Sequence, residues 1–250
     1  MNNIDINEYN INYLKKYLPS DKLEEGLKRL SNGEPVQYIV GNVDFYGLEI
    51  YIDSRVLIPR FDTEELVEHV TKLVNKYYNS KANIIDLGTG SGCISLALKN
   101  NLPNSYITGV DISSDALIVA NHNKDKLNMD VTFIKSDMLD NINEKFDIIV
   151  SNPPYLSKEK SYVEDIVDIN EPKIALYADN NGLYFYNKIL STCKKNLNDR
   201  FIIAFEMDEF QGNYIKKLAY KYLGDDIDIN ILKALNGNDR FIIIKTKDMA

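Results

Sequence analysis

The tetrapeptide Asn152-Pro153-Pro154-Tyr155 holds the residues of this chain that are best suited to chemistry on an amide or amino group. Two consecutive prolines remove two backbone donors and fix two φ angles, so the turn holds its carbonyl groups in one rigid arrangement. The Asn152 side-chain oxygen and the Pro153 carbonyl can accept the two hydrogens of a planar NH₂ group, and the Tyr155 ring offers that group a face. Taken alone, the same residues also suit a turn that ends a strand.

A second motif, Gly88-Thr89-Gly90-Ser91-Gly92, follows an apolar run and leads into a helical pattern. Glycines let the backbone turn tightly and approach a ligand closely, and the start of the following helix presents unpaired N–H groups to a carboxylate. The Gly-x-Gly-x-Gly spacing differs from the dinucleotide fingerprint, which disfavours a bound pyrophosphate.

An acidic residue, Asp111, ends the next apolar run, about twenty residues after the loop, where a carboxylate can accept hydrogen bonds from ribose hydroxyls. Ribose recognition without a pyrophosphate indicates S-adenosylmethionine. Its adenine would then reach Asp137, which can accept from the adenine amine, and Met138, which can cover the ring or offer its backbone N–H. Taken singly, Asp111 also suits the neighbourhood of a helix N-cap and Met138 a core position, but the combination favours the cofactor.

The bulk composition limits the possible classes of protein. The chain has 250 residues, 44% hydrophobic and 26% charged, as expected for a globular protein of one or two domains. A net charge of −8 argues against direct binding of DNA. We expect a cytoplasmic protein without a membrane association, since the N-terminus lacks a signal-peptide pattern and no run of eighteen apolar residues occurs. Neither a metal nor a disulfide is expected from Cys93 and Cys193.

From residue 83 onward, short β-rich runs alternate with helical patterns, which predicts an α/β doubly wound sheet. Seven strands are expected, at 83–87, 105–111, 131–136, 146–151, 201–206, 226–232 and 241–245. Helices are expected at 92–100, 114–127, 182–197 and 210–223. The last two strands have no room for a helix between them, so they should form an antiparallel hairpin.

The segment before this sheet predicts three smaller elements. Two short helices are expected within residues 4–33, the second begun by a capping box of Asp21 and Glu24. Alternation around Gly47 predicts a β-hairpin over residues 43–52. A long helix should start at Asp62 or Thr63.

These residues, in this order, resemble the seven-stranded S-adenosylmethionine-dependent methyltransferases, and specifically the HemK/PrmC family of protein-(glutamine-N5) methyltransferases. The resemblance covers residues 34–245. Besides the motifs above, the landmarks are Glu34 to Gly41, Phe45 in the hairpin, Leu57 to Arg60, Thr63-Glu64, Glu171-Pro172, Ala175-Leu176 and Gln211-Gly212. The chain departs from the family pattern at Phe61, Met138 and Met207, and its segment before Glu34 is shorter than expected.

The resemblance implies methyl transfer to the glutamine amide of the Gly-Gly-Gln motif in class-1 peptide chain release factors. It implies a helical N-terminal domain at residues 1–33, a β-hairpin linker at 34–60 and a catalytic domain at 61–250. By resemblance, the cofactor would contact Gly88 to Gly92, Asp111, Met138 and Asn152, and the glutamine would contact Asn152 to Tyr155.

Three alternatives share parts of this pattern. N6-adenine methylation of nucleic acid also uses an Asn-Pro-Pro-Tyr motif, because its target is a planar NH₂ group. Glutamine methylation of a ribosomal protein would differ only in the docking surface. A cofactor-binding protein without activity is the third.

An amide nitrogen is a poor nucleophile, so the expected route is orientation of its NH₂ group by Asn152 and Pro153, with the proton released after transfer. No strong base is needed. We expect Arg60 and Glu171 to shape or close the pocket, and the two histidines, His69 and His122, to lie outside the chemistry.

Overall fold

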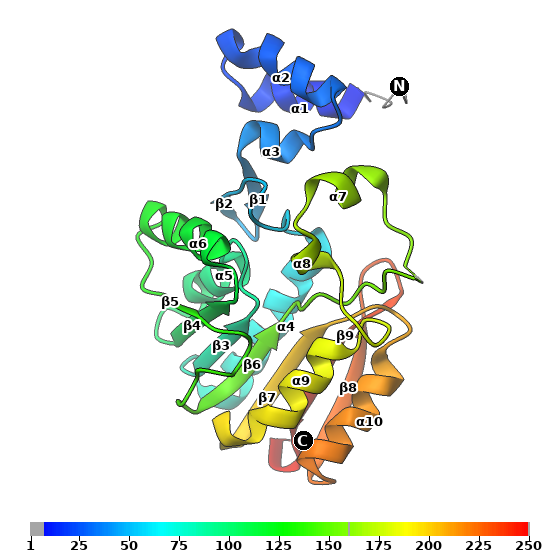
Figure 1. The fold of residues 1–250 in the computed structure, drawn as a ribbon. Coiled ribbons are helices and arrows are strands. Elements are labelled where there is room, and N and C mark those ends of the chain that lie inside the picture. Colours follow the sequence, from blue (N-terminus) through cyan, green and yellow to red (C-terminus); the bar gives the residue numbers. More distant parts are fainter. Residues whose placement is uncertain (1–7, 160, 250) are drawn as a thin grey trace.

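The computed structural model describes residues 8–159 and 161–249. A sheet with helices on both faces forms the larger part of the molecule, and a small helical group projects from it beyond a β-hairpin (Figure 1). In the described part of the chain, no helix is both long and apolar enough to span a membrane.

Seven strands form the sheet in the order β5-β4-β3-β6-β7-β9-β8. They are β3 (Asn83–Leu87), β4 (Tyr106–Asp111), β5 (Thr132–Lys135), β6 (Phe146–Ser151), β7 (Leu197–Glu206), β8 (Ile227–Lys233) and β9 (Asp239–Thr246). The strands β3 to β7 pair in parallel, while β9 runs antiparallel to both of its neighbours. The expected sheet and its antiparallel last hairpin are therefore confirmed, although β7 begins at Leu197 and not at the expected Phe201.

Consecutive residues of the central strands face opposite layers, as a pleated strand requires. Ile84, Ile148 and Ile202 pack in one core cluster, whereas their neighbours Ile85, Ile149 and Ile203 pack in the other. All six are fully buried, which explains why these strands read as continuous apolar runs.

Five helices cover the two faces. The first face is packed by α4 (Phe61–Tyr78), α5 (Cys93–Asn101) and α6 (Ser114–Lys126), and the second by α9 (Tyr184–Thr192) and α10 (Gly212–Leu223). The expected helix at 182–197 divides into α9 and the 3₁₀ turn η2 (Cys193–Asn196), and α4 begins at Phe61, just before the expected start. A last 3₁₀ turn, η3 (Lys247–Met249), follows β9.

The helical group before the sheet consists of α1 (Glu8–Tyr17), η1 (Ser20–Lys22), α2 (Leu23–Ser31) and α3 (Val36–Val40). Leu14, Leu30, Val36 and Ile39 form its own small core. The two expected helices are present, although residues 4–7 of the predicted segment lie outside the described residues. The short helix α3 was not predicted.

The expected capping box of Asp21 and Glu24 is wrong. Asp21 lies inside η1, and the N-cap of α2 is Lys22, which makes no side-chain capping bond. Pro19 fixes the backbone before this turn, so a 3₁₀ turn runs directly into the helix and leaves no extended N-cap position for Asp21.

The hairpin of β1 (Asn42–Phe45) and β2 (Leu48–Tyr51) confirms the alternation around Gly47. Its two turn residues, Tyr46 and Gly47, both have positive φ, at 48° and 79°, as a two-residue hairpin turn prefers. The fully buried Asn123 of α6 fastens this hairpin to the sheet domain. Its Oδ1 accepts from the Tyr51 N–H, and its Nδ2 donates to the carbonyls of Tyr51 and Ser91.

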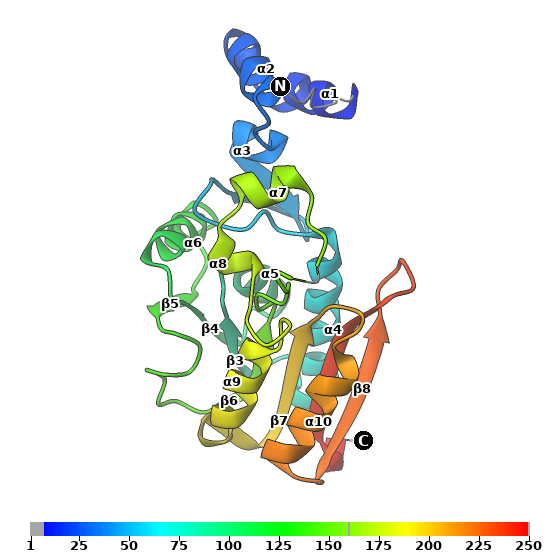
Figure 2. The ribbon, with the colours of Figure 1, turned by 45° about the vertical axis from the view of Figure 1, so that its right-hand side comes forward.

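Two short helices, α7 (Asp165–Asn170) and α8 (Lys173–Leu176), lie between β6 and α9. In both ribbon views this segment passes across the upper end of the sheet, between the sheet and the N-terminal helices (Figure 2). It therefore covers the end of the sheet at which the parallel strands finish.

Replacing Asn123 with alanine should lower the free energy of unfolding by about 1–3 kcal/mol, because the buried Ser91 carbonyl and the partly buried backbone groups of Tyr51 lose their partner. Urea unfolding of Asn123→Ala beside Asn121→Ala measures this. Asn121 lies in the same helix, and among the described residues its side chain donates to the Leu117 carbonyl one turn earlier, so its loss should cost clearly less. Equal losses for both variants would contradict the role of Asn123.

Candidate active site

A cavity of about 190 Å³ lies at the carboxyl ends of β3, β4, β5 and β6. The chain runs outward from β3 to β5 and then returns to β6 on the other side of β3, so this is the point at which strand order reverses and where open α/β sheets bind ligands. The cavity brings together seven of the predicted site residues: Gly88, Gly90, Asp111, Asp137, Met138, Asn152 and Pro154.

Only part of the glycine-rich loop lines this cavity. Gly88 and Gly90 do so with φ of 73° and 55°, and neither has a heavy atom within 4 Å of the place that a Cβ would occupy. Thr89 and Ser91 are buried, and neither they nor Gly92 are among the lining residues. The open face of the loop is therefore backbone, which suits close approach of a ligand.

Asp86 holds the loop from beneath. Its Oδ2 accepts from the hydroxyls of Thr89, at 2.6 Å, and Ser95, at 2.7 Å. Because Asp86 is fully buried, desolvation raises its pKa to about 6. Thr89 thus serves the geometry of the loop, and this explains why its hydroxyl is turned away from the cavity.

Asp111 lies at the end of β4 and lines the cavity. Its Oδ2 accepts from the Gly90 N–H and its Oδ1 from the Ser113 N–H, each at 2.9 Å. Burial raises the pKa of this carboxyl group. Each oxygen has a further lone pair, so the carboxylate is fixed in place and can still accept from two hydroxyl groups.

Asp137 and Met138 follow β5 and line the same cavity. Met138 has a φ of 53°, in the left-handed region, which non-glycine residues adopt at a cost. The Asp137 carboxylate pairs with Lys188 of α9 at 2.7 Å, and Lys188 also contacts Asp140. Sequence reasoning missed Lys188, because nothing in its helical pattern distinguishes it from the other lysines of the chain.

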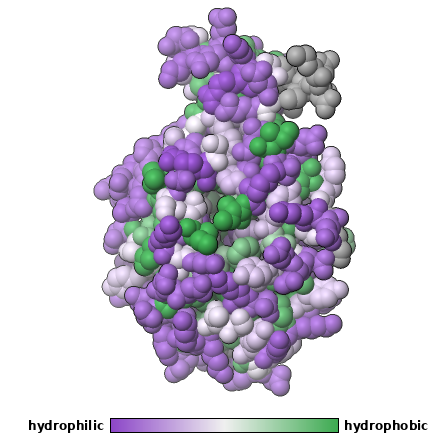
Figure 3. Space-filling view, in the orientation of Figure 1, coloured by the Kyte–Doolittle hydropathy of each residue, from purple (hydrophilic) through white to green (hydrophobic). Residues whose placement is uncertain are grey.

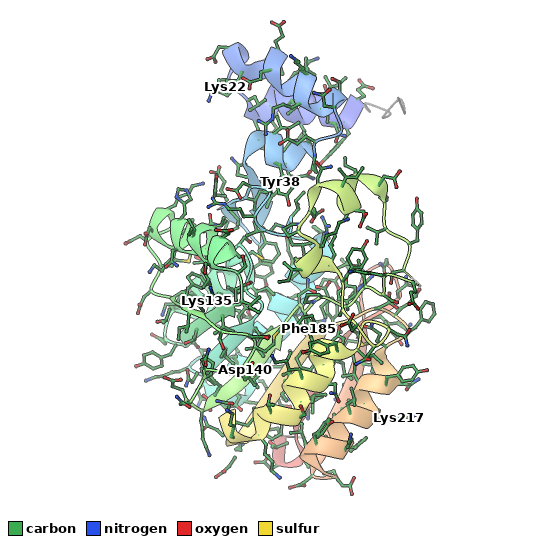
Figure 4. All side chains as sticks on the ribbon, in the orientation of Figure 1. Lys22, Tyr38, Lys135, Asp140, Phe185 and Lys217 are labelled. Carbon is green, nitrogen blue, oxygen red and sulfur yellow. The ribbon has the colours of Figure 1, made fainter. Side chains whose placement is uncertain are left out.

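The apolar part of the cavity wall comes from several elements. Ile112 and Ile174 line it while remaining 46% and 56% exposed, and Phe185 joins them from the start of α9 (Figure 4). On the face shown in Figure 3, hydrophobic residues gather beside a hollow near its centre, below the N-terminal helices. An apolar wall beside polar loop groups fits an aromatic ring joined to a polar chain.

A second cavity, of about 90 Å³, adjoins the first. All four residues of the tetrapeptide line it, together with Arg60. The two cavities share Leu57, Asn152, Pro154 and Ala175. Asn152 and Pro154 therefore lie between a larger space beside the glycine-rich loop and a smaller one that holds Pro153 and Tyr155.

The side chains of the tetrapeptide are tied to a buried network. Asn152 Nδ2 donates to Thr63 Oγ1 at 3.1 Å, and Thr63 donates to Glu206 Oε2 at 2.7 Å. The Tyr155 hydroxyl donates to Glu206 Oε1 at 3.2 Å and accepts from Arg240 at 3.4 Å. Burial raises the pKa of Tyr155, so its phenol is neutral.

The backbone of Tyr155 is also fixed. Its carbonyl accepts from Gln211 Nε2 at 2.9 Å, and a Cβ on Gly182 would approach the same oxygen to 2.0 Å. Gly182 has a φ of 82°, so glycine suits this position both sterically and conformationally.

Glu171, which follows α7, joins the α7–α8 segment to the residues just before α4. This residue is only 4% exposed, accepts from the Ile58 N–H at 3.1 Å and pairs with Arg60 at 2.7 Å. Residues more than a hundred positions apart are thereby joined, and of these Arg60 lines the smaller cavity. That Arg60 and Glu171 shape or close the pocket stays a prediction.

Sequence reasoning did not identify Thr63, Glu206 or Arg240 as site residues. The sequence marks Thr63 only as a helix start and a family landmark. Glu206 offered one signal, because it ends the apolar run Phe201 to Phe205 as the only charged residue of that buried strand end. Arg240 offered none, since it follows a turn and its partners come from three other elements.

Known proteins similar to this chain include release factor glutamine methyltransferases from several bacteria. A release factor glutamine methyltransferase of Streptococcus pneumoniae is 40% identical to the chain over 223 residues, which are 89% of this chain and 78% of that protein. That of Flavobacterium psychrophilum is 40% identical over 224 residues, with 88% and 78% covered. The chain belongs to the release factor glutamine methyltransferase family. The HemK/PrmC resemblance is thus confirmed.

Three further matches place the fold of the chain among methyltransferases. Residues 61–173 match the family described as Methyltransferase small domain. A methyltransferase structure from Pyrococcus furiosus has a TM-score of 0.61 at 18% identity, covering 90% of this chain and 98% of that one. The catalytic domain of hMettl16 has a TM-score of 0.62 at 16% identity, covering 80% and 76%. Such distant likenesses show the fold alone.

Two buried carboxyl groups, those of Asp86 and Glu206, make the stability of the folded chain depend on pH. Burial raises the pKa of Asp86 from 3.8 to about 6 and that of Glu206 from 4.5 to about 7. The folded chain therefore holds these protons more tightly than the unfolded chain. Their contribution to stability is complete below the unfolded-state values and is lost as pH rises through about 6 and about 7.

Urea unfolding of the wild type and of Glu206→Gln, at a series of pH values, tests this. The stability of the wild type relative to the variant should fall as the pH rises through the folded-state pKa, because the variant carries no proton to lose. A constant difference in stability between pH 4.5 and about 7 would show that Glu206 does not titrate in the folded protein.

Proposed function

We propose that this protein transfers a methyl group from S-adenosyl-L-methionine to the side-chain nitrogen of the glutamine in the Gly-Gly-Gln motif of class-1 peptide chain release factors. The observation that carries the proposal is the pair of adjoining cavities with Asn152 and Pro154 between them, in a chain of this family. One cavity is suited to the cofactor and the other to the glutamine amide.

The residues of the larger cavity fit the cofactor. We assign the ribose hydroxyls to Asp111, the adenine to Asp137 and Met138, and the methionine end to the backbone of Gly88 and Gly90. Since the side chains of Thr89 and Ser91 are buried, the loop as a whole, with Gly92, would act through its backbone and shape. When bound, the cofactor supplies an electrophilic methyl group on a positively charged sulfur and leaves as S-adenosyl-L-homocysteine.

The tetrapeptide orients the nucleophile. The Asn152 Oδ1 and the Pro153 carbonyl each accept one hydrogen of the glutamine NH₂ group, which directs the nitrogen toward the larger cavity, while Pro154 and Tyr155 wall the smaller cavity. As the new N–C bond forms, the nitrogen becomes acidic and releases one proton to water. Orientation of this kind can lower a barrier by roughly 7–11 kcal/mol.

We propose that the chain consists of three functional parts: a helical N-terminal domain at residues 1–33, a hairpin linker at 34–60 and a catalytic domain at 61–250. A groove of about 540 Å³ supports a docking role for the first two parts. It is lined by α1, the hairpin and the start of α4, and includes Tyr9, Tyr13, Tyr17 and the 70% exposed Phe61. Because release factors act on ribosomes, we place the protein in the cytoplasm.

The direct test offers the purified protein and S-adenosylmethionine three substrates: a class-1 release factor, a ribosomal protein and an adenine-containing oligonucleotide. Mass spectrometry should locate one added methyl group on the glutamine of the Gly-Gly-Gln motif. Methyl on the ribosomal protein or the oligonucleotide alone would overturn the proposal.

Asn152→Ala should reduce turnover on the release factor by about 10²-fold or more, because the NH₂ group loses one of its two acceptors. Its affinity for S-adenosylmethionine, measured by calorimetry, should change little, since most of the cofactor cavity remains. A variant with wild-type turnover would contradict the role of Asn152, and a variant that no longer binds the cofactor would assign Asn152 to cofactor binding instead.

A further inference from the structure

Two chains of hydrogen bonds converge on one buried carboxylate beneath the tetrapeptide. In the first, Asn152 donates to Thr63, and Thr63 donates to Glu206. In the second, Arg240 donates to the Tyr155 hydroxyl, which donates to Glu206. Glu206 is 1% exposed and Thr63 is 2% exposed, so water cannot easily replace these partners.

The direction of the first chain follows from the number of hydrogens available. An ionised carboxylate only accepts, so the single hydroxyl hydrogen of Thr63 must point to Glu206. Thr63 can then only accept from Asn152, and the end of the amide that it contacts must be Nδ2. The other end, Oδ1, is left for a ligand.

We propose that Glu206 and Thr63 are positioning residues that hold the Asn152 amide in the orientation that accepts hydrogens, and thereby select a glutamine amide over a glutamate carboxylate. This inference rests on the proposed function. If the amide turned over, Nδ2 would face the ligand and favour a carboxylate or carbonyl oxygen. The same carboxylate fixes the Tyr155 hydroxyl, so the side chains of Asn152 and Tyr155 both depend on it.

The charged and titratable groups around Glu206 come from several elements, and they include the buried Cys93 thiol of α5, on which the Glu206 charge acts. Arg240 of β9 lies beside it and is itself 3.3 Å from Asp62 of α4. Tyr155 contacts the carboxylate, and the Tyr186 hydroxyl of α9 donates to the backbone carbonyl of Glu206. Arg240 favours the ionised form, whereas burial and Asp62 favour the protonated form and raise the pKa to about 7.

Protonation of Glu206 would remove the constraint. A protonated carboxyl group can donate to Thr63, which frees the Thr63 hydrogen for the Asn152 oxygen and allows the amide to turn over. The selective orientation should therefore exist above the pKa of Glu206 and weaken as the pH falls through it. A purely structural role of Glu206 would not produce this pH dependence.

The first test replaces Thr63 with valine, which keeps the shape and removes the hydroxyl. Turnover of wild-type release factor should fall by about 10–10²-fold, with the affinity for S-adenosylmethionine unchanged. Thr63→Ser should restore most of the turnover, because it restores the hydroxyl. Thr71→Val is the matched control, since Thr71 lies in the same helix and its buried hydroxyl has no partner among the described residues.

The second test measures selectivity without turnover. A release factor with glutamate in place of the methylated glutamine should bind the wild-type enzyme more weakly than the glutamine form does. In Thr63→Val the two affinities should converge, because the amide can then present either end. Wild-type and Thr71→Val proteins should keep the difference.

The third test is the pH profile of kcat. The wild-type value should rise as pH increases through about 7, and that of Glu206→Gln should be low and independent of pH. If the wild type does not methylate the release factor, the proposed function fails. If it does, but Thr63→Val retains wild-type turnover and selectivity, or Glu206→Gln retains the wild-type profile, then the positioning role alone is overturned.

Discussion

The parallel pairing of β3 with β6 is the contact on which the site depends. It sets Asp86 opposite Val150, so the glycine-rich loop and the tetrapeptide leave the sheet side by side. The Ser151 hydroxyl donates to the Leu87 carbonyl at 2.6 Å and fixes the two strand ends at the point where they diverge. Strand order reverses here, so the loops after β3 and β6 diverge and leave a space between them. The proposed places of the cofactor and the amide therefore lie where two neighbouring central strands end.

Around that space the chain uses polar groups that burial makes costly. Asp86 supports the glycine-rich loop, Glu206 supports the tetrapeptide and Glu171 holds the α7–α8 segment. All three carboxyl groups are at least nine-tenths buried. Each accepts from two groups, which offsets part of the cost of desolvation. Stability alone favours the protonated form of Glu206, whereas the orientation of Asn152 requires the ionised form. Ionised Glu206 thus lowers the stability of the site but fixes the orientation of the Asn152 amide, and functional sites commonly combine such opposing requirements.

The sequence predicted the sheet well because its signals are local. Most of the seven strands contain a short apolar run between turn residues, and alternation around Gly47, whose φ is 79°, marked the hairpin turn, although its neighbour Tyr46 also adopts a positive φ. The predictions failed where a neighbour changed a local preference. A proline at position 19 turned the expected cap at Asp21 into a 3₁₀ turn, and the five-residue α3 is too short to show a periodic pattern. Packing against α1 and α2, rather than propensity, stabilises that helix.

By itself the sequence indicated the kind of chemistry, because a proline-locked Asn152, a glycine-rich loop and Asp111 occur together and in this order, although each of them alone suits a structural role as well. It also determined the order of the strands along the chain. Only the tertiary structure decided which loop residues face the cavity, which partner fixes the Asn152 amide and what covers the site. Those contacts join residues such as Thr63 with Glu206, and Ile58 with Glu171, which are 143 and 113 positions apart. No local pattern specifies them, since each partner is chosen by where the folded sheet places it.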